Sequence, residues 1–263
     1  MRIDNKASRW IALDGAVNAR IVVPGVLLRS DNLQALSARD VRVLLDEQGL
    51  EVVLDLRTAV EVALEGPSPL SAEGTVRIEH RSLYPDAGTG ADPGTVLPWA
   101  PPDQHESPQE RPVVRTYMSY MARRPDSILA SIRAIAAADR AVLVHCAAGK
   151  DRTGVVVALA LDAAGVDRDT IAEDYLATRE RIDAVVARLL SSSTYRTDLA
   201  GLDPQQLAPA PGTIERLLEL IDQRFGGSGA WLSAHGLGDP ELERLRHRLD
   251  PRLADHRMSG AAS

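Results

Sequence analysis

The stretch VHCAAGKDRTG, residues 144–154, holds residue types that could act together on a phosphate ester. Its Cys146 is the only cysteine of the chain, and Arg152 and Thr153 follow after five intervening residues. The stretch lies between AVLVH, a continuous apolar run, and VVVALALDAA, which is apolar nearly all round. This order predicts a loop between a buried strand and a buried helix, whose backbone N–H groups converge above the helix N-terminus as a cradle for an anion.

The residue types inside the stretch suit such a cradle. Gly149 lets the chain turn and approach a ligand, and Gly154 permits close packing in the first helical turn. The guanidinium of Arg152 is a planar fork of donors that matches two oxygens of a phosphate. The residues predicted to contact the substrate are Ala147, Ala148, Gly149, Lys150, Thr153, Gly154 and, from a neighbouring strand, Asp55.

The same positive potential predicts a reactive thiol at Cys146, because cysteines at helix N-termini and beside cations are ionised at neutral pH. A thiolate that faces a phosphate monoester is an in-line nucleophile, so hydrolysis would pass through a phosphorylated sulfur. The cradle and Arg152 would spread the charge of the transferring phosphoryl group. Thr153 would donate a hydrogen bond to the sulfur, and His145 would fix the loop. A buried structural cysteine is the alternative, which the spacing of these residues disfavours.

The composition places this stretch in an acidic, folded protein. The chain has 263 residues, of which 44% are hydrophobic and 25% charged, enough for one large or two small domains. A net charge of −7 disfavours a nucleic-acid partner. No apolar run approaches the roughly 20 residues that span a bilayer. One cysteine and a start without a signal peptide predict a cytoplasmic protein, with secretion without a cleaved signal left open. The scattered histidines predict neither a metal nor a cofactor.

The elements around the stretch follow an α/β pattern. Ser37 predicts the start of a helix that ends at Gly49, and the apolar run at 52–54 is typical of a strand covered on both faces. Thr213 is predicted to cap the helix that follows it, and Pro240 to open the last one. Further elements are predicted as a strand over 75–80 and helices over 113–121, 126–138, 170–190, 214–225 and 239–249. The fold class is therefore α/β, a central, mostly parallel sheet flanked by helices.

In these residues the chain resembles the cysteine-dependent tyrosine phosphatases, whose signature loop is Cys, five residues, Arg, then Ser or Thr. Lys150 and Asp151 before the arginine resemble the bacterial protein tyrosine phosphatase B group. The segments PGVLLRSDNL, VVLDLRTAVE, IAEDYL and TIERLLELIDQRFGGSGAWLSAHGLGDPELERLRHRL resemble it too. The resemblance implies a single phosphatase domain over residues 1–263 with a tyrosine-phosphatase-like fold. A lid or irregular insertion is expected at 84–124, and a helical C-terminal part at 213–250.

The resemblance also implies a substrate class. Phosphotyrosine in proteins is the expected substrate, with broad specificity that extends to phosphoserine, phosphothreonine or phosphoinositides, and inorganic phosphate is the product. A phosphoinositide phosphatase is the alternative. A rhodanese-like sulfurtransferase is disfavoured, because it does not need Arg152 and Thr153. A catalytically inactive phosphate-binding module is a further rival, but nucleophile, arginine and a candidate acid are all present.

The leaving oxygen needs a proton from a positioned carboxylic acid. The tyrosine phosphatases of higher organisms use the aspartate of a Trp-Pro-Asp tripeptide, which this chain lacks, and YPD at 84–86 resembles that tripeptide only weakly. In the resembled group the loop aspartate has this role, which maps to Asp151. Asp55 competes because it lies at the carboxyl end of a strand. The alternatives are that Asp151 caps its helix and that Asp55 pairs with Arg57. Lys150 is either a contact to a second acidic group of the substrate or a solvated charge.

Overall fold

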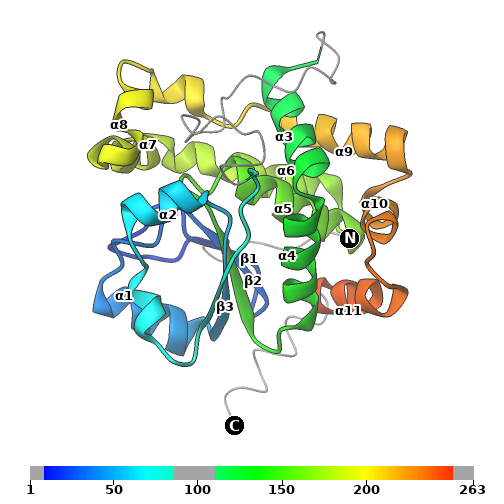
Figure 1. The fold of residues 1–263 in the computed structure, drawn as a ribbon, viewed down its shortest axis with the longest axis horizontal. Coiled ribbons are helices and arrows are strands. Elements are labelled where there is room, and N and C mark those ends of the chain that lie inside the picture. Colours follow the sequence, from blue (N-terminus) through cyan, green and yellow to red (C-terminus); the bar gives the residue numbers. More distant parts are fainter. Residues whose placement is uncertain (1–8, 86–109, 251–263) are drawn as a thin grey trace.

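The centre of the molecule is a sheet that is parallel except at one edge. The computed structural model describes residues 9–85 and 110–250. Five strands lie in the order β1-β2-β5-β3-β4 (Figure 1). They are β1 (Arg20–Val23), β2 (Leu27–Ser30), β3 (Leu50–Asp55), β4 (Arg77–His80) and β5 (Ala141–His145). β1 pairs antiparallel with β2, and the other neighbours pair in parallel. The predicted fold class is confirmed.

Helices connect the strands of this sheet from β2 onward, and further helices follow the last strand, β5, in the chain. The first half holds α1 (Ala38–Arg42) with the π turn η1 (Val43–Glu47), α2 (Ala59–Glu65), the short turn η2 (Pro69–Ala72), α3 (Pro112–Arg123) and α4 (Pro125–Ala137). The second half holds α5 (Asp151–Ala163), α6 (Arg168–Ala177), η3 (Thr178–Arg181), α7 (Ile182–Ser191), α8 (Ser193–Leu199), η4 (Pro204–Leu207), α9 (Thr213–Phe225), α10 (Ser228–Ala234) and α11 (Asp239–Leu249).

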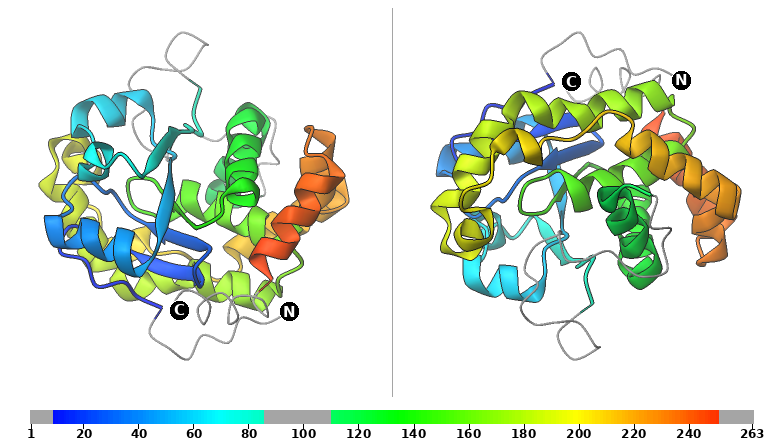
Figure 2. Two further views of the ribbon diagram at one scale, coloured as in Figure 1. Left: turned by 90° about the horizontal axis from the view of Figure 1, so that it is seen from below. Right: turned by 90° about the horizontal axis from the view of Figure 1, so that it is seen from above.

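Both faces of the sheet are buried, which explains the continuous apolar runs of its central strands. In β3, Val52 and Leu54 belong to one core cluster, whereas Leu50 and Val53 belong to the other, because successive side chains of a strand point to opposite faces. The first cluster continues into α3 to α6 and α9 to α11, and the second into α1 and η1. Figures 1 and 2 show these two groups of helices on opposite sides of the sheet.

β5 is the element that places the predicted loop. All its residues are buried, and it lies between β2 and β3 in parallel register. Its carboxyl end therefore meets the carboxyl ends of both neighbours at one edge of the sheet. The helix that follows, α5, is buried along almost its whole length, including its first turn. The predicted order of strand, loop and buried helix is confirmed.

Three predicted features differ in the structure. The helix expected over 170–190 is interrupted, because the 3₁₀ turn η3 separates α6 from α7. Thr213 does not cap α9, since it is the first helical residue and the cap is Gly212, which has a φ of 75° that suits glycine. The lid or irregular insertion expected over 84–124 is wrong in its last part, where α3 forms. Residues 86–109 lie outside the described residues.

Candidate active site

The loop 146–150 turns at a glycine that no other residue could replace. Gly149 has a φ of 65°, and a Cβ added there would lie 2.4 Å from the backbone oxygen of Ser30. The loop therefore presses directly on the backbone at the end of β2. A Cβ at Gly154 would lie 3.1 Å from the ring of Tyr175, which agrees with the predicted close packing in the first turn of α5.

The backbone carbonyls of the loop are held from behind by three donors from the N-terminal part of the chain. The bonds run from the Asn32 N–H to Ala147 (3.0 Å), from Asn18 Nδ2 to Ala148 (2.8 Å) and from Arg29 Nη2 to Gly149 (2.7 Å). Because C=O and N–H of a trans peptide unit point in opposite directions, the N–H groups of residues 148–150 face the other side. This orientation is the one that an anion cradle requires.

A buried ionic network stands behind two of these donors. Asp174 on α6 pairs with Arg20 at 2.9 Å and also with Arg29, and Arg20 Nη1 donates to the side-chain oxygen of Asn18 at 2.5 Å. Burial by itself raises the pKa of Asp174, but the two guanidinium groups lower it to about 2. The carboxylate is therefore charged at neutral pH and offsets part of the positive charge of both arginines in the protein interior.

Arg152 is held by a second buried carboxylate. Its Nη1 and Nη2 lie 2.5 and 2.8 Å from the oxygens of Glu61 on α2. Burial opposes charge on both groups, but the ion pair lowers the pKa of Glu61 and raises that of Arg152, so both stay charged. Within the described part of the chain, Arg152 Nε and the Thr153 hydroxyl are buried without a hydrogen-bond partner. The predicted bond from Thr153 to the sulfur is therefore absent here.

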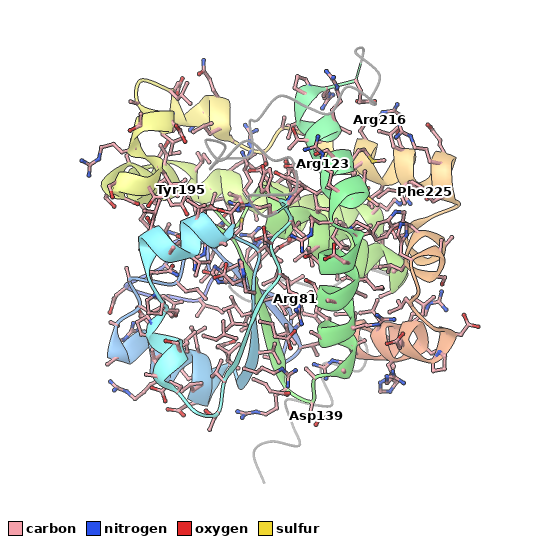
Figure 3. The ribbon with its side chains drawn as sticks, in the orientation of Figure 1. Arg81, Arg123, Asp139, Tyr195, Arg216 and Phe225 are labelled. Carbon is pink, nitrogen blue, oxygen red and sulfur yellow. The ribbon has the colours of Figure 1, made fainter. Side chains whose placement is uncertain are left out.

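Sequence reasoning missed the role of Glu61. The Thr58 hydroxyl and the Glu61 carboxylate cap α2 reciprocally, and a capping box explains such an acid at this spacing. Nothing in the sequence points from that helix to Arg152. The hydroxyl of Tyr195 on α8 also donates to Glu61, at 3.1 Å, and Figure 3 shows Tyr195 on the helix pair that lies over α2.

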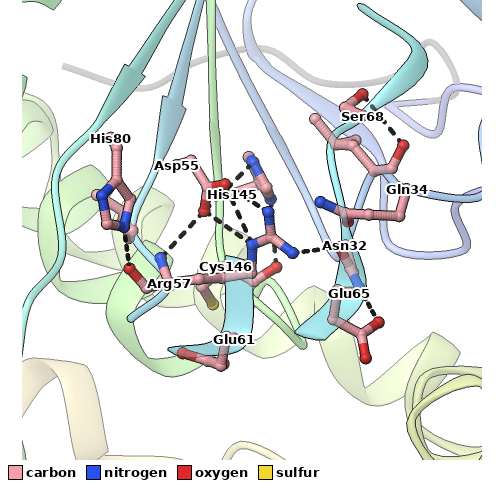
Figure 4. A network of polar contacts seen from close by, with 12 residues as sticks. Asn32, Gln34, Asp55, Arg57, Glu61, Glu65, Ser68, His80, His145 and Cys146 are labelled. Carbon is pink, nitrogen blue, oxygen red and sulfur yellow. Dashed lines mark hydrogen bonds and ion pairs between the residues drawn. The ribbon is translucent and has the colours of Figure 1, made fainter. Parts of the chain in front are cut away.

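Asp55 is part of a network beneath the loop rather than in its opening (Figure 4). Its carboxylate accepts bonds from Arg57 Nε at 2.9 Å and Nη2 at 2.5 Å, and His145 Nε2 lies 3.6 Å away. Burial by itself raises the pKa of Asp55, but His145 and Arg57 lower it below its ordinary value. This arrangement agrees with the structural alternative for Asp55, because a carboxyl held ionised is a poor proton donor.

His145 occupies a position that suits its predicted structural role. Its ring is buried between Asp55 and the loop, with Nδ1 3.3 Å from the backbone oxygen of Cys146. Burial lowers the pKa of His145 to about 4, against the opposing effect of Asp55. The imidazole is therefore neutral at pH 7 and contributes hydrogen-bonding atoms rather than charge.

Asp151 and Lys150 lie side by side at the start of α5. Lys150 Nζ is 3.5 Å from Asp151 Oδ2 and donates to the backbone oxygen of Leu207 at 2.6 Å. The other carboxylate oxygen, Oδ1, accepts a bond of 2.6 Å from the hydroxyl of Tyr117 on α3. The helix-capping alternative for Asp151 receives no support, because Lys150 is the N-cap and no side-chain capping bond is present among the described residues.

A pocket opens above the loop, and its outer wall is apolar. Cys146 and Arg152 contribute to its floor, where their exposed fractions are only 2% and 1%. The outer wall consists of Ile182, Val185, Val186 and Leu189 of α7, together with Leu199 and Leu207. The sequence predicted α7 as part of a packed helix, but an apolar stripe does not reveal which surface it covers.

Comparisons with known proteins show the class of protein to which this fold and site belong. A model of the tyrosine phosphatase family matches residues 13–250. The chain belongs to this family and is a protein-tyrosine phosphatase, a hydrolase, as the sequence predicted.

Two curated relatives are similar over almost the whole chain. The triple specificity protein phosphatase PtpB of Mycobacterium tuberculosis is 30% identical, with 94% of this chain and 98% of the relative covered. A tyrosine-protein phosphatase of Nostoc commune is 27% identical, with 94% of this chain and 82% of the relative covered. Among residues 9–85 and 110–250, no helix is long and apolar enough to cross a membrane.

Proposed function

We propose that this enzyme hydrolyses phosphotyrosine in proteins through a cysteinyl-phosphate on Cys146, with broad specificity toward other phosphate monoesters. The observation that carries the proposal is the loop itself. Its carbonyls of residues 147–149 are held away from the pocket, so its N–H groups face the side on which a phosphate would sit. Arg152, kept charged by Glu61, adds a guanidinium to the same floor.

The reaction has two steps with Asp151 as the acid and base. In the first, the Cys146 thiolate attacks phosphorus, the bond from phosphorus to the tyrosine oxygen breaks, and Asp151 gives that oxygen a proton. In the second, water attacks the phosphorus, its proton passes to Asp151, and the thiolate leaves with release of inorganic phosphate. The N–H groups and Arg152 stabilise the charge of the transferring phosphoryl group in both steps.

The apolar outer wall supports an aryl substrate. An aromatic ring gains free energy by burial against aliphatic side chains such as Ile182 and Val186 of the wall. The hydroxyl groups of an inositol ring would lose hydrogen bonds with water there without regaining them. Broad specificity is supported by the similarity to a relative that is named a triple specificity protein phosphatase.

Phosphoinositide hydrolysis is the second candidate, and Lys150 is the observation that supports it. This residue lines the pocket, and the side chain lies beside Asp151 rather than in open solvent. A second phosphate on the substrate could pair with its ammonium group, which would replace the bond to the backbone of Leu207. Ala147, Ala148, Gly149, Thr153 and Gly154 would contact the first phosphate in either case.

A matched substrate panel tests the proposal. Turnover should be fastest on phosphotyrosine peptides, slower on phosphoserine and phosphothreonine peptides of the same sequence and on phosphoinositides, and abolished on all of them in Cys146→Ser. Lys150→Ala should reduce turnover of phosphoinositides about tenfold more than that of phosphotyrosine. Lys150→Arg, which keeps the positive charge, should recover the turnover of phosphoinositides. Residual turnover by Cys146→Ser, or equal losses in Lys150→Ala, would contradict the respective part of the proposal.

A further inference from the structure

Asp151 is oriented by a tyrosine from another helix. The hydroxyl of Tyr117 donates to Asp151 Oδ1 at 2.6 Å, and the two residues come from α3 and α5. The tyrosine side chain is 1% exposed and belongs to the main core cluster, so its ring cannot change rotamer without disturbing the packing. The carboxyl group of Asp151 is therefore attached to a fixed point of the core.

A second hydroxyl, that of Tyr175, donates to Tyr117 and extends this hydrogen bond into a chain. The oxygens of Tyr117 and Tyr175 lie 2.8 Å apart, and each hydroxyl has one proton to donate. Since Tyr117 gives its proton to the carboxylate, Tyr175 donates to Tyr117, and the chain of bonds runs from α6 through α3 to α5. Burial and the neighbouring carboxylate raise the pKa of Tyr117 well above its ordinary value, so the hydroxyl remains a donor at neutral pH.

The two carboxylate oxygens of Asp151 are consequently not equivalent. Oδ1 is occupied as an acceptor by Tyr117, whereas Oδ2 lies on the side of Lys150, and both Lys150 and Asp151 line the pocket. A carboxylic acid whose Oδ1 already accepts from a tyrosine carries its proton on Oδ2. We infer that Tyr117 is a positioning residue, which holds Asp151 so that Oδ2 presents the proton to the leaving oxygen.

This inference rests on the proposed function, in which Asp151 is the general acid. A loss of acid catalysis has a signature that a merely structural defect lacks, because an acid matters only when the leaving group is poor. Phenyl phosphate has a poor leaving group, whereas the dinitrophenolate of dinitrophenyl phosphate leaves without protonation. The ratio of kcat/KM for these two substrates therefore reports on proton donation and is insensitive to the amount of folded enzyme.

The experiment compares this ratio in the 263-residue protein and its variants. Asp151→Asn should lower kcat/KM on phenyl phosphate by about 10²–10⁴ and spare dinitrophenyl phosphate. Tyr117→Phe should lose about tenfold on phenyl phosphate and stay within about twofold on dinitrophenyl phosphate. The double variant should be no worse than Asp151→Asn alone, because both changes affect one proton transfer.

Tyr120 provides the matched control. It lies one turn further along α3 and is equally buried, but its hydroxyl pairs with that of Tyr84 at 3.0 Å instead of with Asp151. Tyr120→Phe should leave the ratio as in the wild type. Tyr175→Phe, which keeps Tyr117 in place, should shift the ratio in the direction of Tyr117→Phe by a smaller factor, and it tests the inference again should Tyr117→Phe fold poorly.

The outcomes separate the inference from the proposed function. An Asp151→Asn variant that loses equally on both substrates would overturn the role of Asp151 as acid, and this inference with it. A selective loss in Asp151→Asn, together with equal losses on both substrates or no loss in Tyr117→Phe and Tyr175→Phe, would overturn the positioning role alone. A selective loss in Tyr120→Phe as large as that in Tyr117→Phe would overturn it as well.

Discussion

The loop 146–150 is held by different kinds of contact on its two sides. Behind it, the donors Asn18 and Arg29 are buried and supported by the charge of Asp174. In front of it, α7 packs through aliphatic side chains, and the polar contacts of this helix to the body are partly exposed. One of these contacts is the pair between Arg188 and Asp31 at 3.1 Å, in which the arginine side chain is 24% exposed and the aspartate side chain 2%.

From this difference we expect the side behind the loop to be rigid and the side in front of it to move. Removing one partner of a buried charged network leaves an uncompensated charge, whereas a partly exposed ion pair contributes little. Since Cys146 is only 2% exposed and lies at the floor of the pocket, we expect one wall of the pocket to open further when a protein substrate binds. The contacts in front are the weaker ones, so we expect α7 and α8 to move while the cradle keeps its shape.

The largest expected effect comes from breaking the network behind the loop. Asp174→Asn would leave Arg20 and Arg29 without their shared counter-charge, and the free energy of unfolding should fall by about 3–5 kcal/mol. Urea denaturation measures this change. Glu173→Gln, the exposed neighbour on α6, is the control and should change stability by less than about 0.5 kcal/mol. Equal small effects of both substitutions would contradict the comparison.

The neutral His145 beneath the loop predicts how stability depends on pH. Its pKa is lowered from 6.5 to about 4 in the folded protein by burial, against the opposing effect of Asp55. Between these values the unfolded chain binds more protons than the folded one, so stability rises with pH across this window and is lost as pH falls, by up to about 3 kcal/mol. His145→Asn should flatten this part of the curve of unfolding free energy against pH, and an unchanged slope would contradict the assignment.

A substitution of Asn18 tests whether the orientation of the loop affects catalysis. Asn18→Ala removes the donor to the Ala148 carbonyl, which frees that peptide unit to rotate its N–H away from a bound phosphate. We expect kcat/KM on an aryl phosphate to fall about tenfold, equivalent to about 1.4 kcal/mol. Affinity for inorganic phosphate, measured by calorimetry, should fall in parallel. A variant that binds phosphate as tightly as the wild type would show that the carbonyl bond is not needed.

The smallest effect on stability is expected in front of the loop. Arg188→Ala removes the contacts of α7 to Asp31 and to the backbone of Asn32. Because Asp31 keeps its bonds from the backbone N–H groups of Val17 and Asn18, stability should fall by about 1 kcal/mol. Alkylation of Cys146 by iodoacetamide should nevertheless become several-fold faster, because the helix leaves the pocket more often. Arg196→Ala is the control, because within the described part of the chain its bonds go to backbone oxygens of α7 itself. Equal alkylation rates in the two variants would contradict movement of α7.

The parts of the site that could be predicted from the sequence are those that are contiguous in it. Cys146 and Arg152 belong to one short motif, and the apolar runs on both sides of it predicted β5 and α5. The contacts that orient this motif come from distant segments: Glu61 is separated from Arg152 by 91 positions, Asn18 from Ala148 by 130 and Tyr117 from Asp151 by 34. The residues next to Glu61, Asn18 and Tyr117 in the sequence do not indicate these partners, so only the folded structure reveals the contacts.

The central claim is that Cys146 accepts the phosphoryl group, and chemical quenching tests it most directly. The enzyme is mixed with a radiolabelled phosphotyrosine peptide, denatured within milliseconds and digested, and the labelled peptide is identified by mass spectrometry. We predict label on the peptide that contains Cys146 and no such label in Cys146→Ser. Label on another residue, or continued hydrolysis by Cys146→Ser, would contradict the account.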